Sequence, residues 1–132
     1  MGVQKDITRR AQTMQFLLDS EQMTQVLTNL IKNGVDAMQT GGEINIGLED
    51  NLSDVSITVG DTGTGIREED RVKIFEPFFT TKGLGHGTGL GLATAYGIVK
   101  MHQGQITVES NTDPDKGPTG TRFKIVLPRR KD

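Results

Sequence analysis

The spacing of hydrophobic residues changes twice from a helical to a strand pattern, and this limits the folds open to the chain. Apolar residues recur every three or four positions over residues 19–38, which predicts one long amphipathic helix. Residues 43–49 and 55–59 then alternate apolar and polar side chains, as half-buried antiparallel strands do. We expect residues 51–54 to form the turn between these strands.

The same order is repeated in the second half of the chain. Leu92, Ala95, Tyr96 and Val99 predict the buried stripe of a second helix, and strands are expected at 105–110 and 121–127, after a loop over 76–88 and a short helix over 68–75. Two helix-plus-hairpin units predict an α/β (α+β) two-layer sandwich. Its sheet should be mixed or mostly antiparallel, with the helices on one face.

Length and composition favour one soluble globular domain. The 132 residues are 33% hydrophobic and 24% charged, which fits a single core, and cysteine is absent, which excludes disulfides and thiolate metal sites. A net charge of -2 gives no reason to expect nucleic acid. No apolar stretch is long enough for a membrane span, and no signal peptide opens the chain, so we expect a cytoplasmic domain without membrane contact in this segment. Two short strands, 3–9 and 14–18, are weaker predictions.

Asn29, Asn33 and Asp36 fall within roughly 60° of one another on the polar face of the long helix. An ordinary solvent-exposed helix surface would also account for three polar residues on one face. Asparagine is a poor helix former, however, and two of them one turn apart indicate a need for neutral amide oxygens. Ligation of Mg²⁺ beside nucleotide phosphates is one such need.

A second candidate site follows the strand at 55–59, where the residues read Asp61-Thr62-Gly63-Thr64-Gly65-Ile66. An ordinary glycine turn begun by Asp61 would account for this pattern. The alternative is an adenine pocket, in which a buried carboxylate accepts a proton from the exocyclic amino group. The glycines would then let the backbone approach the purine ring.

The segment that follows combines clustered phenylalanines with clustered glycines. Residues 75–82 read FEPFFTTK, and three phenylalanines in a loop indicate either the hydrophobic anchor of a hinged lid or a small separate core. Residues 83–92 read GLGHGTGLGL and run into the second helix, where free backbone N–H groups can bind an anion. Lys82 would stand where a cation meets phosphate.

The order of these segments resembles the GHKL superfamily of ATP-binding domains, and specifically the catalytic domains of sensor histidine kinases. Residues 25–38 (QVLTNLIKNGVDAM) are similar to the N box of that family, and residues 61–66 to its G1 box. FEPFFTTK at 75–82 resembles the F box, and GHGTGLGL at 85–92 the G2 box. The strand that begins at Gly120 is similar to the family's closing strand.

The resemblance implies the Bergerat fold, ATP and Mg²⁺ as cofactors, and a set of site residues. Asn33 would coordinate Mg²⁺ and Asn29 would support the phosphates; these two and Lys82 are the candidate catalytic residues. Asp61 would bind adenine, and Thr121 would reach it through water. Further contacts with the nucleotide would come from Gly63, Gly65, Lys82, Gly87, Thr88, Gly89 and Leu90.

The implied activity is transfer of the γ-phosphate of ATP to a histidine on a separate dimerisation domain of the same kinase, with a response regulator downstream. Because dimerisation would belong to that other domain, we expect the present one to be a monomer. All motifs lie within residues 19–128 of the single domain expected at 1–132. Neither His86 nor His102 has the sequence context of a phosphoacceptor, so self-phosphorylation is not expected. The superfamily's ATPases carry a glutamate where this chain has Asn29, which argues against hydrolysis. A catalytically silent nucleotide-binding module is the alternative.

The sequence departs from the family pattern at Gly34 and Gly60, and His86 lies at a variable position inside the glycine loop. Gly34 stands where the family usually has alanine, which should cost the helix about 0.5–1 kcal/mol. Gly60 precedes Asp61 where a larger residue is commoner in the family.

Overall fold

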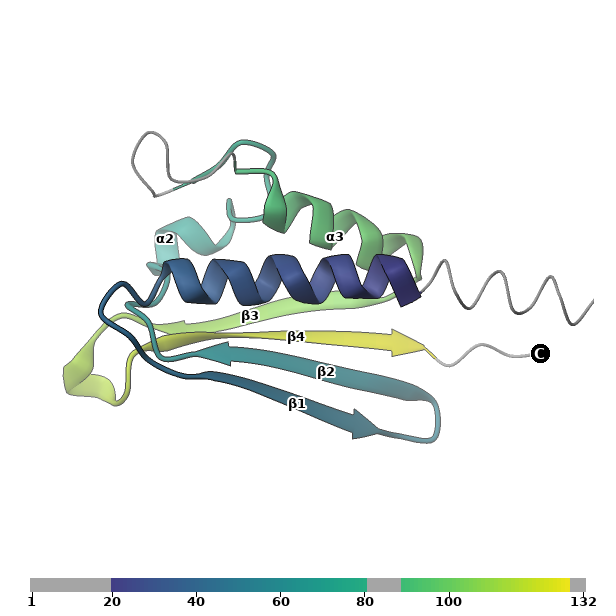
Figure 1. Cartoon of the computed structure of the whole chain (residues 1–132), viewed down its shortest axis with the longest axis horizontal. Helices are drawn as coiled ribbons and strands as arrows, with labels where there is room; N and C mark the ends of the chain where they lie inside the picture. The colour runs from purple at the N-terminus through teal and green to yellow at the C-terminus, as the bar shows by residue number, and fades with distance from the viewer. Residues whose placement is uncertain (1–19, 81–88, 129–132) are drawn as a thin grey trace, which may run out of the picture.

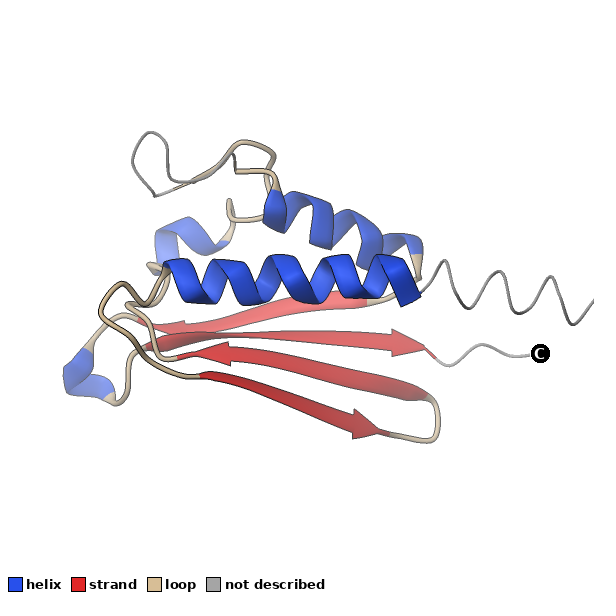
Figure 2. Ribbon diagram, in the orientation of Figure 1, coloured by secondary structure: helices blue, strands red, loops and turns tan. Residues whose placement is uncertain are grey.

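The computed structural model describes residues 20–80 and 89–128, which form a helical layer on one face of a sheet (Figures 1 and 2). A long helix occupies residues 20–36 and is the darkest ribbon of Figure 1. The labelled elements are β1 (Ile44–Asp50), β2 (Asp54–Asp61), α2 (Glu68–Arg71), α3 (Gly91–Met101), β3 (Gln105–Asn111) and β4 (Gly120–Pro128), with a 3-10 turn at Pro114–Lys116. The predicted α/β sandwich is therefore confirmed. The strands predicted at 3–9 and 14–18 lie outside the described residues.

The four strands form one sheet in the order β1-β2-β4-β3. Every pairing between them is antiparallel. β1 and β2 are joined by the tight turn expected at residues 51–54, where the Asn51 N–H donates to the Asp54 carbonyl over 2.9 Å. β2 ends at Asp61, where the glycine turn of residues 61–66 begins.

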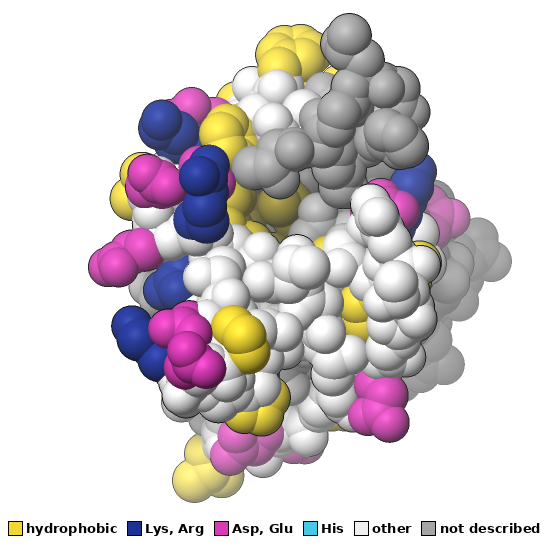
Figure 3. Space-filling view, turned by 90° about the vertical axis from the view of Figure 1, so that its left-hand side faces the viewer, with side chains coloured by type: hydrophobic (Ala, Val, Ile, Leu, Met, Phe, Trp, Pro, Cys, Tyr) yellow, Lys and Arg dark blue, Asp and Glu magenta, His cyan; other side chains and the backbone are white. Residues whose placement is uncertain are grey.

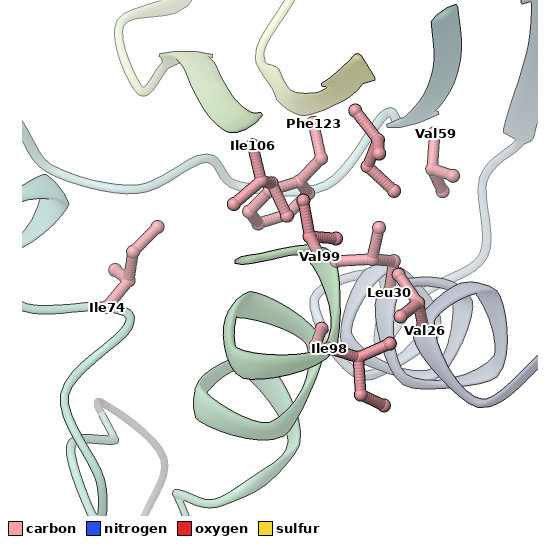
Figure 4. Packing of buried hydrophobic residues seen from close by; sticks show 10 residues of the cluster. Val26, Leu30, Val59, Ile74, Ile98, Val99, Ile106 and Phe123 are labelled. Carbon is pink, nitrogen blue, oxygen red and sulfur yellow. The ribbon is translucent and has the colours of Figure 1, made fainter. Parts of the chain in front are cut away.

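The core lies between the sheet and the helices (Figure 4). Val26 and Leu30 lie one turn apart on the long helix, so both reach the same face and are fully buried. Phe123 and Ile125 alternate with exposed neighbours along β4 and point toward that helix. Each such side chain contributes about 1.5–3 kcal/mol by leaving water.

The buried stripe of α3 differs from the predicted one. Ala95 and Val99 are buried as expected, and Ile98 joins them, whereas the predicted core residue Tyr96 is 37% exposed. Tyr96 lies at the edge of the core, where its ring centroid is 5.2 Å from that of Phe75. The residue thus remains partly accessible to water, which suits a side chain with a polar end.

α2 is also shorter than the helix predicted at residues 68–75. It ends at Arg71, and the chain continues in tight turns in which the Lys73 and Glu76 N–H groups donate to carbonyls three residues earlier. These turns place Ile74 and Phe75 against the core. Among the described residues, no helix is long and apolar enough to cross a membrane.

Candidate functional site

Three polar side chains form a row across the sheet beneath the helices. Asp61 ends β2 and lies opposite Thr121 of β4, which in turn lies opposite Ser110 of β3. Directly opposed residues of antiparallel strands point to the same face, and this face is the one the helices cover. The row lies at the end of the sheet shown on the left of Figure 1. Figure 3 views this end and shows a hollow with hydrophobic side chains at its floor.

The Asp61 carboxylate is partly removed from water. Burial raises its pKa above the ordinary value of 3.8, while backbone hydrogen bonds from Gly63 and Thr121 act in the opposite direction. The Gly63 N–H donates to Oδ1 over 2.9 Å, so one carboxylate oxygen has a fixed partner. A desolvated carboxylate with acceptor capacity left is suited to bind a donor such as an amino group.

Glycines allow backbone segments to approach this carboxylate closely. A Cβ at Gly63 would lie 2.7 Å from the Ala37 carbonyl oxygen, and a Cβ at Gly34 would lie 3.3 Å from Asp61 Oδ2. Gly65 has a φ of 84° and packs against the backbone of Asn111. The glycine turn is therefore more than a reversal of the chain, because it packs against both the turn that ends the long helix and the end of β3.

The two asparagines of the long helix have different surroundings. The Asn29 Nδ2 group donates to the Gly91 carbonyl over 3.1 Å, which ties the long helix to the start of α3 and leaves the amide oxygen of Asn29 as an acceptor. Asn33 is half-buried one turn further on. Asp36, the third residue of the predicted polar face, is exposed.

The phenylalanine segment is anchored in the main core. Phe75 and Phe79 pack against the buried cluster, whereas Phe78 is 73% exposed. The Phe78 N–H donates to the Gly89 carbonyl over 2.8 Å, which joins the two ends of the loop between them. A hydrophobic anchor thus fits better than a separate small core. Lys82, His86, Gly87 and Thr88 lie outside the described residues.

At the described start of α3, the N-cap residue makes no side-chain hydrogen bond to the first turn. Gly89 has a φ of 73° and packs on the Phe78 backbone, where a Cβ would clash. Leu90 occupies the N-cap position, and its apolar side chain cannot accept a hydrogen bond from the first turn of the helix. The start of α3 therefore has the chemistry of an anion site.

Sequence reasoning did not identify Ser110 as part of this site. Its hydroxyl lies within 2.9 Å of Thr121 Oγ1 and also contacts the turn after Asp61. The sequence did indicate Ser110 through its position. Ser110 ends a predicted strand, and pairing that strand with the one containing Thr121 brings the two hydroxyls together.

Comparison with known proteins shows the family to which the chain belongs. The family model described as histidine kinase-, DNA gyrase B- and HSP90-like ATPase matches residues 18–131 of the chain. The chain belongs to this family. Sporulation kinase A of Bacillus subtilis (strain 168) is 45% identical over 112 residues, which are 85% of this chain. Sensor histidine kinase ZraS of Escherichia coli (strain K12) is 41% identical over 114 residues, or 86% of this chain.

Solved structures lead to the same assignment. A mycobacterial sensor histidine kinase, MprB, matches with a TM-score of 0.72 and 31% identity over 86% of this chain and 74% of its own. The catalytic domain of histidine kinase ThkA matches with a TM-score of 0.68 and 37% identity over 82% of this chain and 67% of its own. The present chain is thus a histidine kinase catalytic domain. It spans only 17% of sporulation kinase A and 24% of ZraS.

Proposed function

We propose that this domain binds MgATP and donates the γ-phosphate to a histidine on a separate dimerisation domain of the same kinase. The observation that supports this most directly is the half-buried Asp61 carboxylate, which lies beside Thr121 at the end of the sheet. Burial removes part of the water that would otherwise donate hydrogen bonds to this carboxylate. The amino group of a bound adenine would donate in place of that water. Gly63 and Gly65 would shape the walls of the purine pocket.

The phosphates would extend from the purine toward the start of α3. The N-cap residue Leu90 has no side chain that could cap the first turn of that helix, so we expect phosphate oxygens to bind the backbone N–H groups there, with Gly89 leading into the turn. Lys82, Gly87 and Thr88 belong to the same proposal on the strength of the family resemblance alone. Their role would be to neutralise phosphate charge, because phosphoryl transfer requires positioning and electrostatic stabilisation above all.

Mg²⁺ fits the donors present on the long helix. The described residues hold no group of three or more His, Cys, Asp or Glu side chains placed for a metal ion. A magnesium ion here would take most of its ligands from phosphate and water, and the amide oxygen of Asn33 would add one hard ligand. The amide nitrogen of Asn29 donates to the Gly91 carbonyl, so its amide oxygen would point toward the phosphates. The metal would supply charge neutralisation on the γ-phosphate.

The acceptor histidine would come from outside this domain. His102 lies at the C-terminal end of α3, where its Nδ1 is 2.8 Å from the Ile98 carbonyl oxygen. A histidine at this position is favourable for the helix end, so no acceptor role is needed to account for it. His86 lies outside the described residues, in the glycine-rich segment. The remaining parts of the proposal are a monomeric cytoplasmic domain, a partner domain bearing the histidine, and a response regulator downstream.

Two measurements test the proposed function. Isothermal titration should show binding of MgATP and much weaker binding of MgGTP, because guanine places an oxygen where adenine has its amino group. Incubation with γ-labelled ATP should leave this domain unlabelled on its own and label the histidine-bearing domain when that domain is added. Acid-labile label on this domain alone would contradict the assignment of the acceptor.

A catalytically silent module gives a different result in the same experiment. Such a module would bind MgATP but would not label the histidine-bearing domain. The titration therefore tests the nucleotide site, and the labelling tests the transfer.

A further inference from the structure

Ser110 makes three hydrogen-bonding contacts at the edge of the proposed purine pocket. Its Oγ lies 2.7 Å from the Ile66 amide nitrogen, 2.9 Å from the Gly120 carbonyl oxygen and 2.9 Å from Thr121 Oγ1. It therefore joins the turn that follows Asp61 to the start of β4. The side chain of Arg71 in α2 also donates to the Ser110 carbonyl and holds the backbone of this residue in place.

The three partners of Ser110 determine where the hydroxyl protons lie. A serine hydroxyl has one proton and two lone pairs. The Ile66 N–H can only donate and the Gly120 carbonyl can only accept, so the serine proton goes to Gly120 and one lone pair takes the Ile66 N–H. The second lone pair is left for Thr121, whose own proton must point at Ser110. This is the arrangement that forms all three bonds at once.

The Thr121 hydroxyl can therefore take part in further hydrogen bonds only as an acceptor. Its side chain is buried, with 5% exposure, and it lies opposite Asp61 on the same face of the sheet. The carboxylate of Asp61 and the hydroxyl of Thr121 lie on the same face of the sheet, and both would act as acceptors. A water that bridges them would spend its two protons on them and offer the purine only lone pairs. A purine with a 6-amino group presents a donor to this pair, whereas a 6-oxo purine presents an oxygen that finds no proton.

We propose that Ser110 sets the purine preference of the site by holding the Thr121 hydroxyl as a hydrogen-bond acceptor. Ser110 is a positioning residue and does not touch the nucleotide itself. This inference rests on the proposed function, since it concerns the selectivity of the same adenine site. Without Ser110, the Thr121 hydroxyl is free to turn and donate its proton to the bridging water, which can then donate one of its own protons to a 6-oxo group.

The test compares the affinities of ADP and inosine diphosphate (IDP), which differ at positions 1 and 6 of the purine. Both are titrated by calorimetry into the full 132-residue chain at one Mg²⁺ concentration, for the wild type and Ser110→Ala. The variant should lower the ratio of ADP to IDP affinity by about tenfold, the size expected for one mismatched hydrogen bond in a buried site. Loss of the Ile66 contact weakens both nucleotides alike, so this structural effect cancels in the ratio.

Ser56→Ala is the matched control. Ser56 is a buried serine of β2, but it points to the face of the sheet away from the helices, so its loss should leave the ratio unchanged. Thr121→Val provides a second route, because it keeps the Ser110 bonds to Ile66 and Gly120 and removes the acceptor. It should lower the ratio as well, and adding Ser110→Ala to it should produce no further change.

The outcomes separate the inference from the proposed function. A wild-type chain that binds neither nucleotide contradicts the proposed function itself. If ADP binds well but Ser110→Ala weakens ADP and IDP equally, Ser110 is only structural and the inference is overturned. If Ser110→Ala does not fold, as judged by its thermal unfolding, Thr121→Val decides, and a wild-type ratio in that variant overturns the inference too.

Discussion

Asp61→Asn should weaken nucleotide binding without lowering the stability of the nucleotide-free domain. The substitution preserves the shape of the side chain, and the amide oxygen can still accept the 2.9 Å hydrogen bond from the Gly63 N–H. The second carboxylate oxygen becomes an NH₂ group, which would face the adenine amino group as a second donor. The loss of a charged acceptor should weaken ADP binding by about 1.5–3 kcal/mol, or roughly 10- to 150-fold.

The nucleotide-free domain should not be destabilised by the same change. The pKa of Asp61 is raised in the folded state above 3.8, mainly because burial disfavours the charged form. The folded protein then binds the proton more tightly than the unfolded chain, so this group makes stability fall as pH rises from about 3.8 through the folded pKa. At neutral pH the charge is therefore a cost, and its removal should leave the unfolding midpoint unchanged or raise it.

The assay combines calorimetric titration with ADP and chemical unfolding without nucleotide, because a bound ligand would itself raise the apparent stability. Asp54→Asn is the matched control, since Asp54 begins the same strand and its Oδ1 accepts a 2.9 Å hydrogen bond from Asn51. The control should retain ADP affinity and lose at most about 1 kcal/mol of stability. An ADP affinity for Asp61→Asn within about twofold of the wild type would refute the reasoning.

Further predictions concern the metal, the glycines and the pH dependence of binding. Asn33→Ala should reduce the enhancement of ATP binding by Mg²⁺, measured by titration with and without EDTA; an unchanged enhancement would remove Asn33 from the metal site. Gly97→Ala should stabilise the domain by about 0.5–1 kcal/mol in chemical unfolding, because nothing lies within 4 Å of its Cβ position in α3. Gly63→Ala should destabilise it, because its Cβ would lie 2.7 Å from the Ala37 carbonyl oxygen, and a wild-type unfolding midpoint would contradict that packing. ADP affinity should fall at acidic pH as Asp61 takes up a proton, and Asp61→Asn should abolish this part of the pH profile.

Much of the fold could be predicted because each hairpin repeats a simple pattern. Alternation over residues 43–49 and 55–59 gave strands whose observed bounds, Ile44–Asp50 and Asp54–Asp61, differ by one or two residues. The pairing of β2 with β4 was not predicted, since these strands are far apart in sequence and alternation does not specify a partner. That pairing is what places Asp61 beside Thr121.

The errors arose where tertiary contacts decide the outcome. Helical spacing placed Tyr96 in the core, but the contact with Phe75 puts its ring at the edge of the sandwich. The helix predicted at 68–75 stops at Arg71 because the turns that follow bring Phe75 onto the core. Ser110 was missed for the same reason, since its partners come from two other segments of the chain.

Gly34 shows how local helix propensity and the site are connected. A glycine inside the long helix costs about 0.5–1 kcal/mol relative to alanine, so by propensity alone the position is unfavourable. In the fold, a Cβ there would lie 2.8 Å from Ile44 Cδ1 and 3.2 Å from the Cβ of Asp61. The bare backbone lets the helix lie close to the carboxylate on one side, and this close approach contributes to the burial that raises the pKa of Asp61. A carboxylate that has lost part of its water in advance gives up less hydration when a ligand donor arrives. The glycine that weakens the helix thus helps to bury the carboxylate that we propose as the acceptor of a purine amino group.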